Sequence, residues 1–186
     1  MGALAAGSVV LVPFPLKTFD INITAEINRL FDDSSIPTGP PVAVILMGGP
    51  ASGKTKIRKE RFSTGYVLID AADIFLSLSR GGSYPFPEAF EEPMDLLGRL
   101  ITHRALTERR NIVTEIIGAD QERTVQLIDA LKSIGYTVNA EFIFCEIDEA
   151  MRRNRTRGDD NISAYYAEAF QMKWIVGTCQ ELVEGR

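Results

Sequence analysis

An uncharged aliphatic run, residues 42–47, leads directly into a turn with the spacing Gly48-x-x-x-x-Gly53-Lys54-Thr55. Such a run is typical of a central strand of a parallel sheet, whose two faces are both covered by helices. A strand that precedes this spacing of glycine, lysine and threonine is the context of a phosphate-binding loop. The pattern therefore predicts an α/β fold of the P-loop NTPase or kinase type, with a parallel sheet and helices on both faces.

Each residue type in the loop has a physical task. Glycines allow successive backbone N–H groups to point inward and surround a nucleotide phosphate. The lysine would reach the β- and γ-phosphate oxygens of ATP, and the threonine hydroxyl would bind Mg²⁺. The alternative is a glycine-rich turn of no function, against which the strand, the spacing, the lysine and the threonine all argue. The predicted nucleotide-binding residues are Gly48, Gly49, Pro50, Ala51, Ser52, Gly53, Lys54 and Thr55.

Length and composition narrow the class of protein. A chain of 186 residues suits one α/β domain, and we divide it into an N-terminal strand, helix and linker, 1–41, and a kinase domain, 42–186. The net charge of -5 argues against a nucleic-acid partner. Neither Cys145 nor Cys179 has metal-ligand or disulfide spacing, so we expect buried, reduced thiols in a cytoplasmic protein. No stretch predicts a membrane span.

Periodicity predicts the remaining elements. Apolar residues at helical spacing indicate an N-terminal helix that ends near Asp32, and a linker follows. Buried stripes predict a long helix around 94–105 and another over about 120–134, which ends at Gly135. We expect Leu127, Ile128, Leu131 and Ile134 to be buried on the latter. The predicted strands are 1–15 (a covering strand), 66–70, 111–115 and 137–147. Alternation of strands and helices predicts right-handed crossovers, with the ligand at the carboxyl ends of the strands.

Three acids, Asp70, Asp73 and Glu115, lie at or just beyond the ends of two predicted strands. Phosphoryl transfer needs a carboxylate to orient and deprotonate the acceptor hydroxyl, and often another near the metal. The alternative is that these acids cap the helices that follow, as the position of Asp70 before a helix start suggests.

Four arginines, at 152, 153, 155 and 157, follow the last predicted strand. Arg153 and Arg157 are four residues apart and would share one helix face. Guanidinium groups that close over the nucleotide would neutralise charge on the transferred phosphoryl group. The alternative is a solvated basic face, offset by neighbouring acids.

The chain resembles the zeta-toxin family of P-loop kinases from about Val42 to Arg157. The nucleotide loop is one point of likeness. A second is Asn111-Ile112-Val113-Thr114-Glu115, similar to the family strand whose terminal glutamate contacts the substrate. The segment Ile69-Asp70-Ala71-Ala72-Asp73-Ile74-Phe75 is similar to the one with the catalytic aspartate. When the family segment is aligned on Phe75, the catalytic base falls on Asp73. An ungapped alignment on Ile69 and Asp70 places it at Ala72, and Asp70 or Asp73 would then have to take that role.

The resemblance implies a kinase that uses ATP and Mg²⁺ to phosphorylate a hydroxyl of a small molecule, with a UDP-amino-sugar as the leading acceptor. It also implies an antitoxin-like protein partner. The family's late strand has no counterpart before Arg186, so we expect a minimal or truncated member. Two alternatives stay open: another P-loop kinase, acting on a nucleoside, an antibiotic or a polynucleotide end, or an ATP-binding partner protein without turnover.

Overall fold

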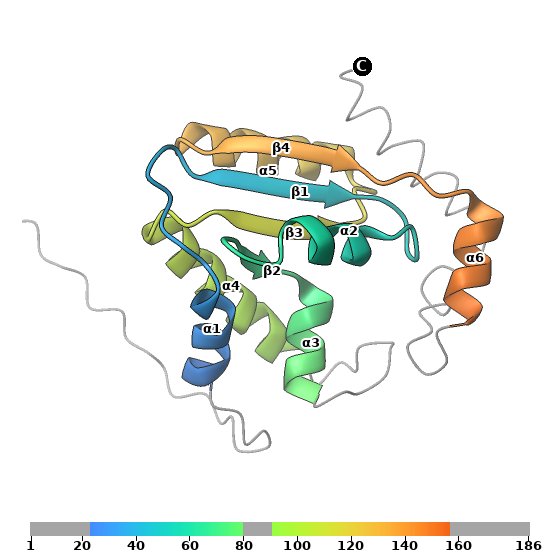
Figure 1. The fold of residues 1–186 in the computed structure, drawn as a ribbon, viewed down its shortest axis with the longest axis horizontal. Helices are drawn as coiled ribbons and strands as arrows, with labels where there is room; N and C mark the ends of the chain where they lie inside the picture. Colours follow the sequence, from blue (N-terminus) through green and yellow to red (C-terminus); the bar gives the residue numbers. More distant parts are fainter. Residues whose placement is uncertain (1–22, 80–90, 157–186) are drawn as a thin grey trace, which may run out of the picture.

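The computed structural model describes residues 23–79 and 91–156. Within them, four parallel strands form one sheet in the order β2-β3-β1-β4 (Figure 1). The strands are β1 (Val42–Met47), β2 (Val67–Ile69), β3 (Ile112–Ile116) and β4 (Thr137–Phe142). The predicted α/β fold with a parallel sheet is confirmed. The expected strand over 1–15, the thiol of Cys179 and the side chain of Arg157 lie outside the described residues.

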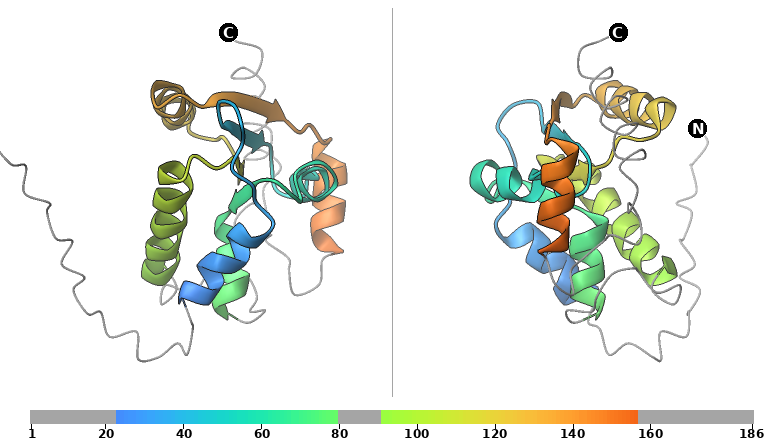
Figure 2. Two further views of the ribbon diagram at one scale, coloured as in Figure 1. Left: turned by 60° about the vertical axis from the view of Figure 1, so that its left-hand side comes forward. Right: turned by 90° about the vertical axis from the view of Figure 1, so that its right-hand side faces the viewer.

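Helices cover both faces of the sheet. The helix α2 (Lys54–Arg61) lies on one side, and α4 (Glu91–Thr107) and α5 (Gln121–Ser133) lie on the other (Figure 2). The remaining helices are α1 (Ile23–Asp32), α3 (Ala71–Ser79) and α6 (Ile147–Arg155). Alternate residues of β1 face the two covers, so that Ile45 packs in the core with α4, and Val44 packs on the side of α2. All of β1 from Ala43 onward is buried, as its apolar sequence predicts.

The strand register brings two of the three predicted acids to one edge. Leu46 of β1 pairs with Glu115 of β3, so Glu115 lies one residue before the end of the central strand. Ile69 of β2 pairs with Thr114, so the next residue, Asp70, comes level with Glu115. Both carboxylates therefore lie where the phosphate loop begins, at the carboxyl ends of the strands.

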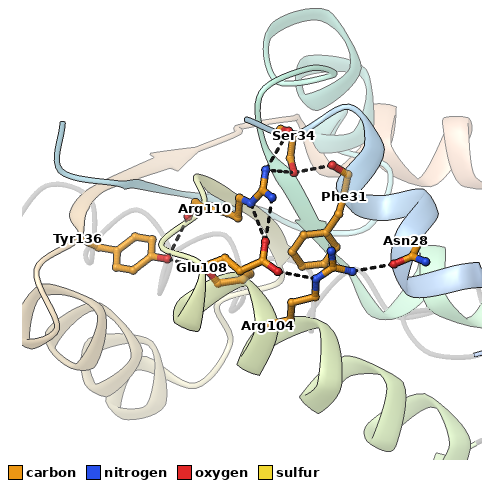
Figure 3. Close-up of polar contacts among 8 residues, drawn as sticks. Asn28, Phe31, Ser34, Arg104, Glu108, Arg110 and Tyr136 are labelled. Carbon is orange, nitrogen blue, oxygen red and sulfur yellow. Dashed lines mark hydrogen bonds and ion pairs between the residues drawn. The ribbon is translucent and has the colours of Figure 1, made fainter. Parts of the chain in front are cut away.

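A polar network fastens α1 to the opposite end of the sheet (Figure 3). The Arg104 guanidinium donates to Asn28 and lies 4.0 Å from the centre of the Phe31 ring. Glu108 accepts from Arg104 and from Arg110, and these hydrogen bonds, that of Arg104 first, lower the pKa of its carboxyl. Because Leu30 and Phe31 also belong to the main core, α1 is held as part of the sheet's cover.

Two expectations about the later elements are wrong. The strand predicted over 137–147 ends at Phe142, and Ile147 begins α6 instead. The apolar residues Cys145 and Ile147 do not extend the sheet, because they pack against Ala51 of the phosphate loop. On α5, Leu131 is buried and Ile128 packs against the core partly buried. Leu127 is 37% exposed and Ile134, just after the helix, is 46% exposed, since only one narrow stripe of the helix meets the sheet.

Candidate active site at the phosphate loop

The loop between β1 and α2 has a backbone that few sequences can adopt. Ala51 has φ 59° and Gly53 has φ 109°, both in the left-handed region. Gly48 is required for another reason, since a Cβ there would lie 2.6 Å from the carbonyl oxygen of Ile143. The connection from β4 to α6 thus passes directly against the first glycine of the loop.

The side chains of the loop fit a phosphate group. The Ser52 hydroxyl is buried and has no hydrogen-bond partner among the residues that the structure describes, although buried polar groups are normally paired. The Lys54 ammonium lies over the loop and donates to the carbonyl oxygens of Gly48 and Gly49 at 2.8 and 3.0 Å. With the first N–H groups of α2 at the same place, this cradle presents donors and positive charge to an anion.

Glu115 joins β3 to α2 at the end of the phosphate loop. Its Oε2 accepts a hydrogen bond of 2.8 Å from the Thr55 hydroxyl, and its Oε1 accepts one of 2.6 Å from Arg58 Nε. The side chains of Arg58 and Glu115 are only 14% and 7% exposed. Sequence reasoning identified Glu115 and Thr55 separately but missed Arg58. Its spacing of three from Thr55 on α2, which puts both on one helix face, was the available signal.

Removing Arg58 should destabilise the fold. Arg58→Met would leave the Glu115 carboxylate buried without its cation, and we expect a loss of about 3 kcal/mol in the free energy of unfolding. Arg61→Met is the matched control, because Arg61 forms a 2.6 Å ion pair from the same helix to Glu141, with side chains 53% and 29% exposed. Its loss should be below about 1 kcal/mol. Urea unfolding measures both, and equal losses would contradict the buried-pair interpretation.

Asp70 has both a structural and a chemical character. Its Oδ1 accepts from the backbone N–H of Asp73 at 2.8 Å, so it caps the start of α3, as the capping alternative predicted. Burial raises the pKa of its carboxyl, and the charge of Glu115 adds to this. The hydrogen bond from Asp73 N–H and the charge of Arg58 act in the opposite direction. Perturbed carboxyls at strand ends are candidate acid–base groups.

Asp73 lies toward α1 instead. Its Oδ2 accepts from Arg29 Nη2 at 3.0 Å, and Arg29 also bonds to Glu26 and Ser77. The structure therefore gives the two candidate aspartates different surroundings, with Asp70 beside Glu115 and Asp73 in a polar link between α3 and α1.

The arginines of α6 differ in their distance from the loop. Arg152 and Arg153 both bond to Glu149, and these contacts, that of Arg152 first, lower the pKa of its carboxyl to about 2. Ala150 of α6 packs on Ala51, which places the helix against the loop. A Cβ built on Gly53 would lie 3.9 Å from Arg153 Nη1, so this guanidinium lies beside the loop.

A metal at this site would have few protein ligands. Within 23–79 and 91–156, no group of three or more histidine, cysteine, aspartate or glutamate side chains could hold a metal ion. Mg²⁺ commonly keeps several waters and binds one or two protein groups together with substrate phosphates. Thr55, with Glu115 on its hydroxyl, fits that kind of site.

A model of the zeta toxin family matches residues 27–165, more than half of the chain. The chain belongs to the zeta toxin family. Zeta toxins are P-loop kinases, and the matched range contains every candidate site residue from Gly48 to Arg157. The family and its structural neighbours thus support a P-loop kinase. No match was found among curated proteins.

Three solved structures illustrate the shared fold. One, from the PezAT toxin-antitoxin system of Streptococcus pneumoniae, has 16% identity and a TM-score of 0.61, covering 87% of this chain and 69% of the other. The structure of AvrRxo1-ORF1:AvrRxo1-ORF2 with ATP has 14% identity and a TM-score of 0.66. The match covers 88% of this chain and 57% of the other. The Pnkp1/Rnl/Hen1 RNA repair complex has 18% identity and a TM-score of 0.59. The match covers 81% of this chain and 47% of the other. The chain thus spans about half the length of the last of these.

None of the helices within the described ranges is long and apolar enough to cross a bilayer.

Proposed function

We propose that this protein is an ATP-dependent kinase that transfers the γ-phosphoryl group to a hydroxyl of a small molecule. The observation that carries the proposal is the joining of the phosphate loop to a strand-end carboxylate through the Thr55–Glu115 hydrogen bond, with Asp70 level beside it. Bound Mg²⁺ would neutralise charge on the β- and γ-phosphate oxygens. With ATP bound, Lys54 would hold those oxygens, Thr55 would supply the metal-binding hydroxyl, and residues 48–53 would surround the β-phosphate.

We assign the base to Asp70. The sequence favoured Asp73, with Asp70 as the alternative. The contact of Asp73 with Arg29 argues against it, because that carboxylate already has a cationic partner. A raised pKa makes Asp70 a better proton acceptor, since a base works best when its pKa approaches the working pH. Its neighbour Glu115, which we expected to position the acceptor, would act between the metal and the acceptor.

We propose Arg153 and Arg157 as the arginines that stabilise charge on the transferred group. Arg153→Ala should lower kcat by about 10- to 10³-fold with ATP affinity nearly unchanged, because such a group acts mainly in the transition state. Arg152→Ala is the matched control, as it shares the partner Glu149. Steady-state kinetics at saturating ATP and acceptor provide the measurement. Equal, small effects in both variants would favour the alternative that the arginines of α6 form a solvated basic face.

The acceptor is tested first with a UDP-amino-sugar, the candidate that the family resemblance implies. Incubation with ATP, Mg²⁺ and a panel of hydroxyl metabolites should give a product heavier by one phosphoryl group in mass spectrometry. A product from a nucleoside, an antibiotic or a polynucleotide end would favour the other P-loop kinases. Saturable ATP binding without any product would favour a binding protein without turnover.

A protein partner and a cytoplasmic location belong to the same proposal. Two of the structural neighbours belong to pairs of proteins, the PezAT toxin-antitoxin system and AvrRxo1-ORF1:AvrRxo1-ORF2. The buried, free thiol of Cys145 is consistent with a reducing compartment. Co-purification from the native host, with the toxicity of the chain measured with and without the adjacent gene product, tests for an antitoxin-like partner.

A further inference from the structure

The carboxylate of Glu115 has a different partner on each of its two oxygens. Arg58 Nε donates to Oε1 at 2.6 Å, and Thr55 Oγ1 donates to Oε2 at 2.8 Å. Both partners come from α2. The side chains of Arg58 and Glu115 are 14% and 7% exposed and so form a pair shielded from water, whereas Thr55 is exposed.

Rigid elements hold both ends of this pair. Glu115 lies in β3, where its register partner is Leu46 of the central strand. The helix α2 lies over β1 and β3 (Figure 1), and its residue Ile57 packs against the core cluster on that face of the sheet. Groups on strands and helices are held more exactly than groups on loops. The packing of α2 on the sheet therefore fixes how Thr55 meets Glu115.

The direction of the Thr55 hydroxyl hydrogen follows from this arrangement. An ionised carboxylate can only accept, so the hydroxyl gives its hydrogen to Glu115. The lone pairs of the hydroxyl oxygen then stay available to the phosphate-bound Mg²⁺ of a nucleotide. Outer groups that orient a metal ligand in this way matter, because their loss typically costs about 10- to 100-fold in metal affinity or activity.

We propose that Arg58 is a positioning residue for the metal-binding hydroxyl of Thr55. By holding Oε1 of Glu115, it keeps Oε2 on that hydroxyl and prevents the carboxylate from rotating away. The inference rests on the proposed kinase function and deepens it, because it gives Glu115 a supporting task at the metal and leaves Asp70 as the base. Burial raises the pKa of the Asp70 carboxyl and the charge of Arg58 acts against this, so Arg58 also offsets negative charge beside the base.

Arg58→Lys tests the positioning, because lysine keeps the positive charge but cannot reproduce the planar guanidinium contact. The measurement is calorimetry on the full chain with a non-hydrolysable ATP analogue, with and without Mg²⁺. The ratio of the two dissociation constants is the Mg²⁺ enhancement of nucleotide binding. We expect Arg58→Lys to reduce this enhancement by about tenfold and kcat by about 10- to 100-fold, with the metal-free affinity nearly unchanged.

Arg61→Lys is the matched control. Arg61 ends the same helix and holds Glu141 of β4 through hydrogen bonds of 2.6 and 2.8 Å, but its side chain is 53% exposed. The Mg²⁺ enhancement and kcat of Arg61→Lys should stay within about twofold of the wild type. The proposal is overturned by wild-type values in Arg58→Lys, by equal losses in the two variants, or by a wild type without any Mg²⁺ enhancement.

A second pair of variants decides the question if Arg58→Lys does not fold. In Glu115→Gln, the Arg58 guanidinium should attract the amide oxygen, so that the amide NH₂ faces Thr55 and donates to its oxygen. We expect the Mg²⁺ enhancement to fall at least about tenfold. In Arg58→Met/Glu115→Gln the amide can turn its oxygen to Thr55, and both buried charges are removed together. This double variant should recover part of the enhancement. No loss in Glu115→Gln, or no recovery in the double variant, contradicts the role of Arg58.

Binding and turnover together separate failure of this inference from failure of the kinase proposal. Product formation from ATP and the panel of hydroxyl metabolites is followed by mass spectrometry in parallel with calorimetry. If the wild type and Arg58→Lys form product equally fast, the kinase function holds and the role of Arg58 is wrong. If the Mg²⁺ enhancement depends on Arg58 but no metabolite is phosphorylated, the role of Arg58 at the metal holds and the turnover proposal loses support.

Discussion

Lys54→Ala should reduce phosphoryl transfer by at least about 10³-fold. The Lys54 ammonium is the cation carried by the loop itself, where it lies over the carbonyl oxygens of Gly48 and Gly49. With nucleotide bound it would turn to the β- and γ-phosphate oxygens, where negative charge develops as the bond to the leaving group breaks. Initial rates at saturating ATP and acceptor measure the loss.

The matched control for this variant is Lys56→Ala. Lys56 lies on the same helix, but its side chain is 79% exposed and its ion pair with Glu60 spans 3.8 Å. We expect Lys56→Ala to keep nearly full activity, because exposed pairs of this kind contribute little. Circular dichroism and thermal melting should show that Lys54→Ala is folded. A folded Lys54→Ala protein with wild-type turnover would exclude the phosphate-loop mechanism.

Asp70→Asn should lower kcat by about 10²–10⁴-fold with little change in ATP affinity, because the amide keeps the shape but cannot accept a proton. Asp73→Asn is the matched control, three residues away on the same segment, and should reduce the rate far less. If Asp73→Asn alone causes the large loss, the base is Asp73 and the assignment drawn from the Arg29 contact is wrong. An unchanged kcat in both variants would show that neither aspartate is the base.

Asp70→Asn should leave the free energy of unfolding unchanged or raise it at neutral pH. The folded-state pKa of Asp70 lies above its ordinary value of 3.8, so the folded protein binds this proton more tightly than the unfolded chain does. Its contribution to stability is therefore complete below 3.8 and is lost as the pH rises through the folded-state pKa. Asparagine can still cap α3 without a buried charge. Urea unfolding at pH values from about 3 to 7 should show that the free energy of unfolding depends less on pH in Asp70→Asn than in the wild type.

Much of the architecture could be predicted from local patterns. Glycine, lysine and threonine after an aliphatic run identified the phosphate loop, because its backbone depends on residues within eight positions of one another. The periodic stripe of Met94, Leu97, Ile101 and Ala105 predicted the helix α4 and its buried face. The last three are buried, and Met94 packs against the core partly buried. The end of β4 was not predictable, because Cys145 and Ile147 are as apolar as strand residues and only their packing on Ala51 turns the chain into α6.

The sequence by itself determined the loop, the order of strands and helices, and the family, since each depends on residue types at short spacings. Only the tertiary structure decided which of the candidate site residues contact one another. Arg58 and Glu115 are 57 positions apart, and Arg29 and Asp73 are 44 apart. Such pairs depend on strand register and on where α1 and α2 pack, and no local pattern encodes these. The separation of Asp70 from Asp73 follows from that packing.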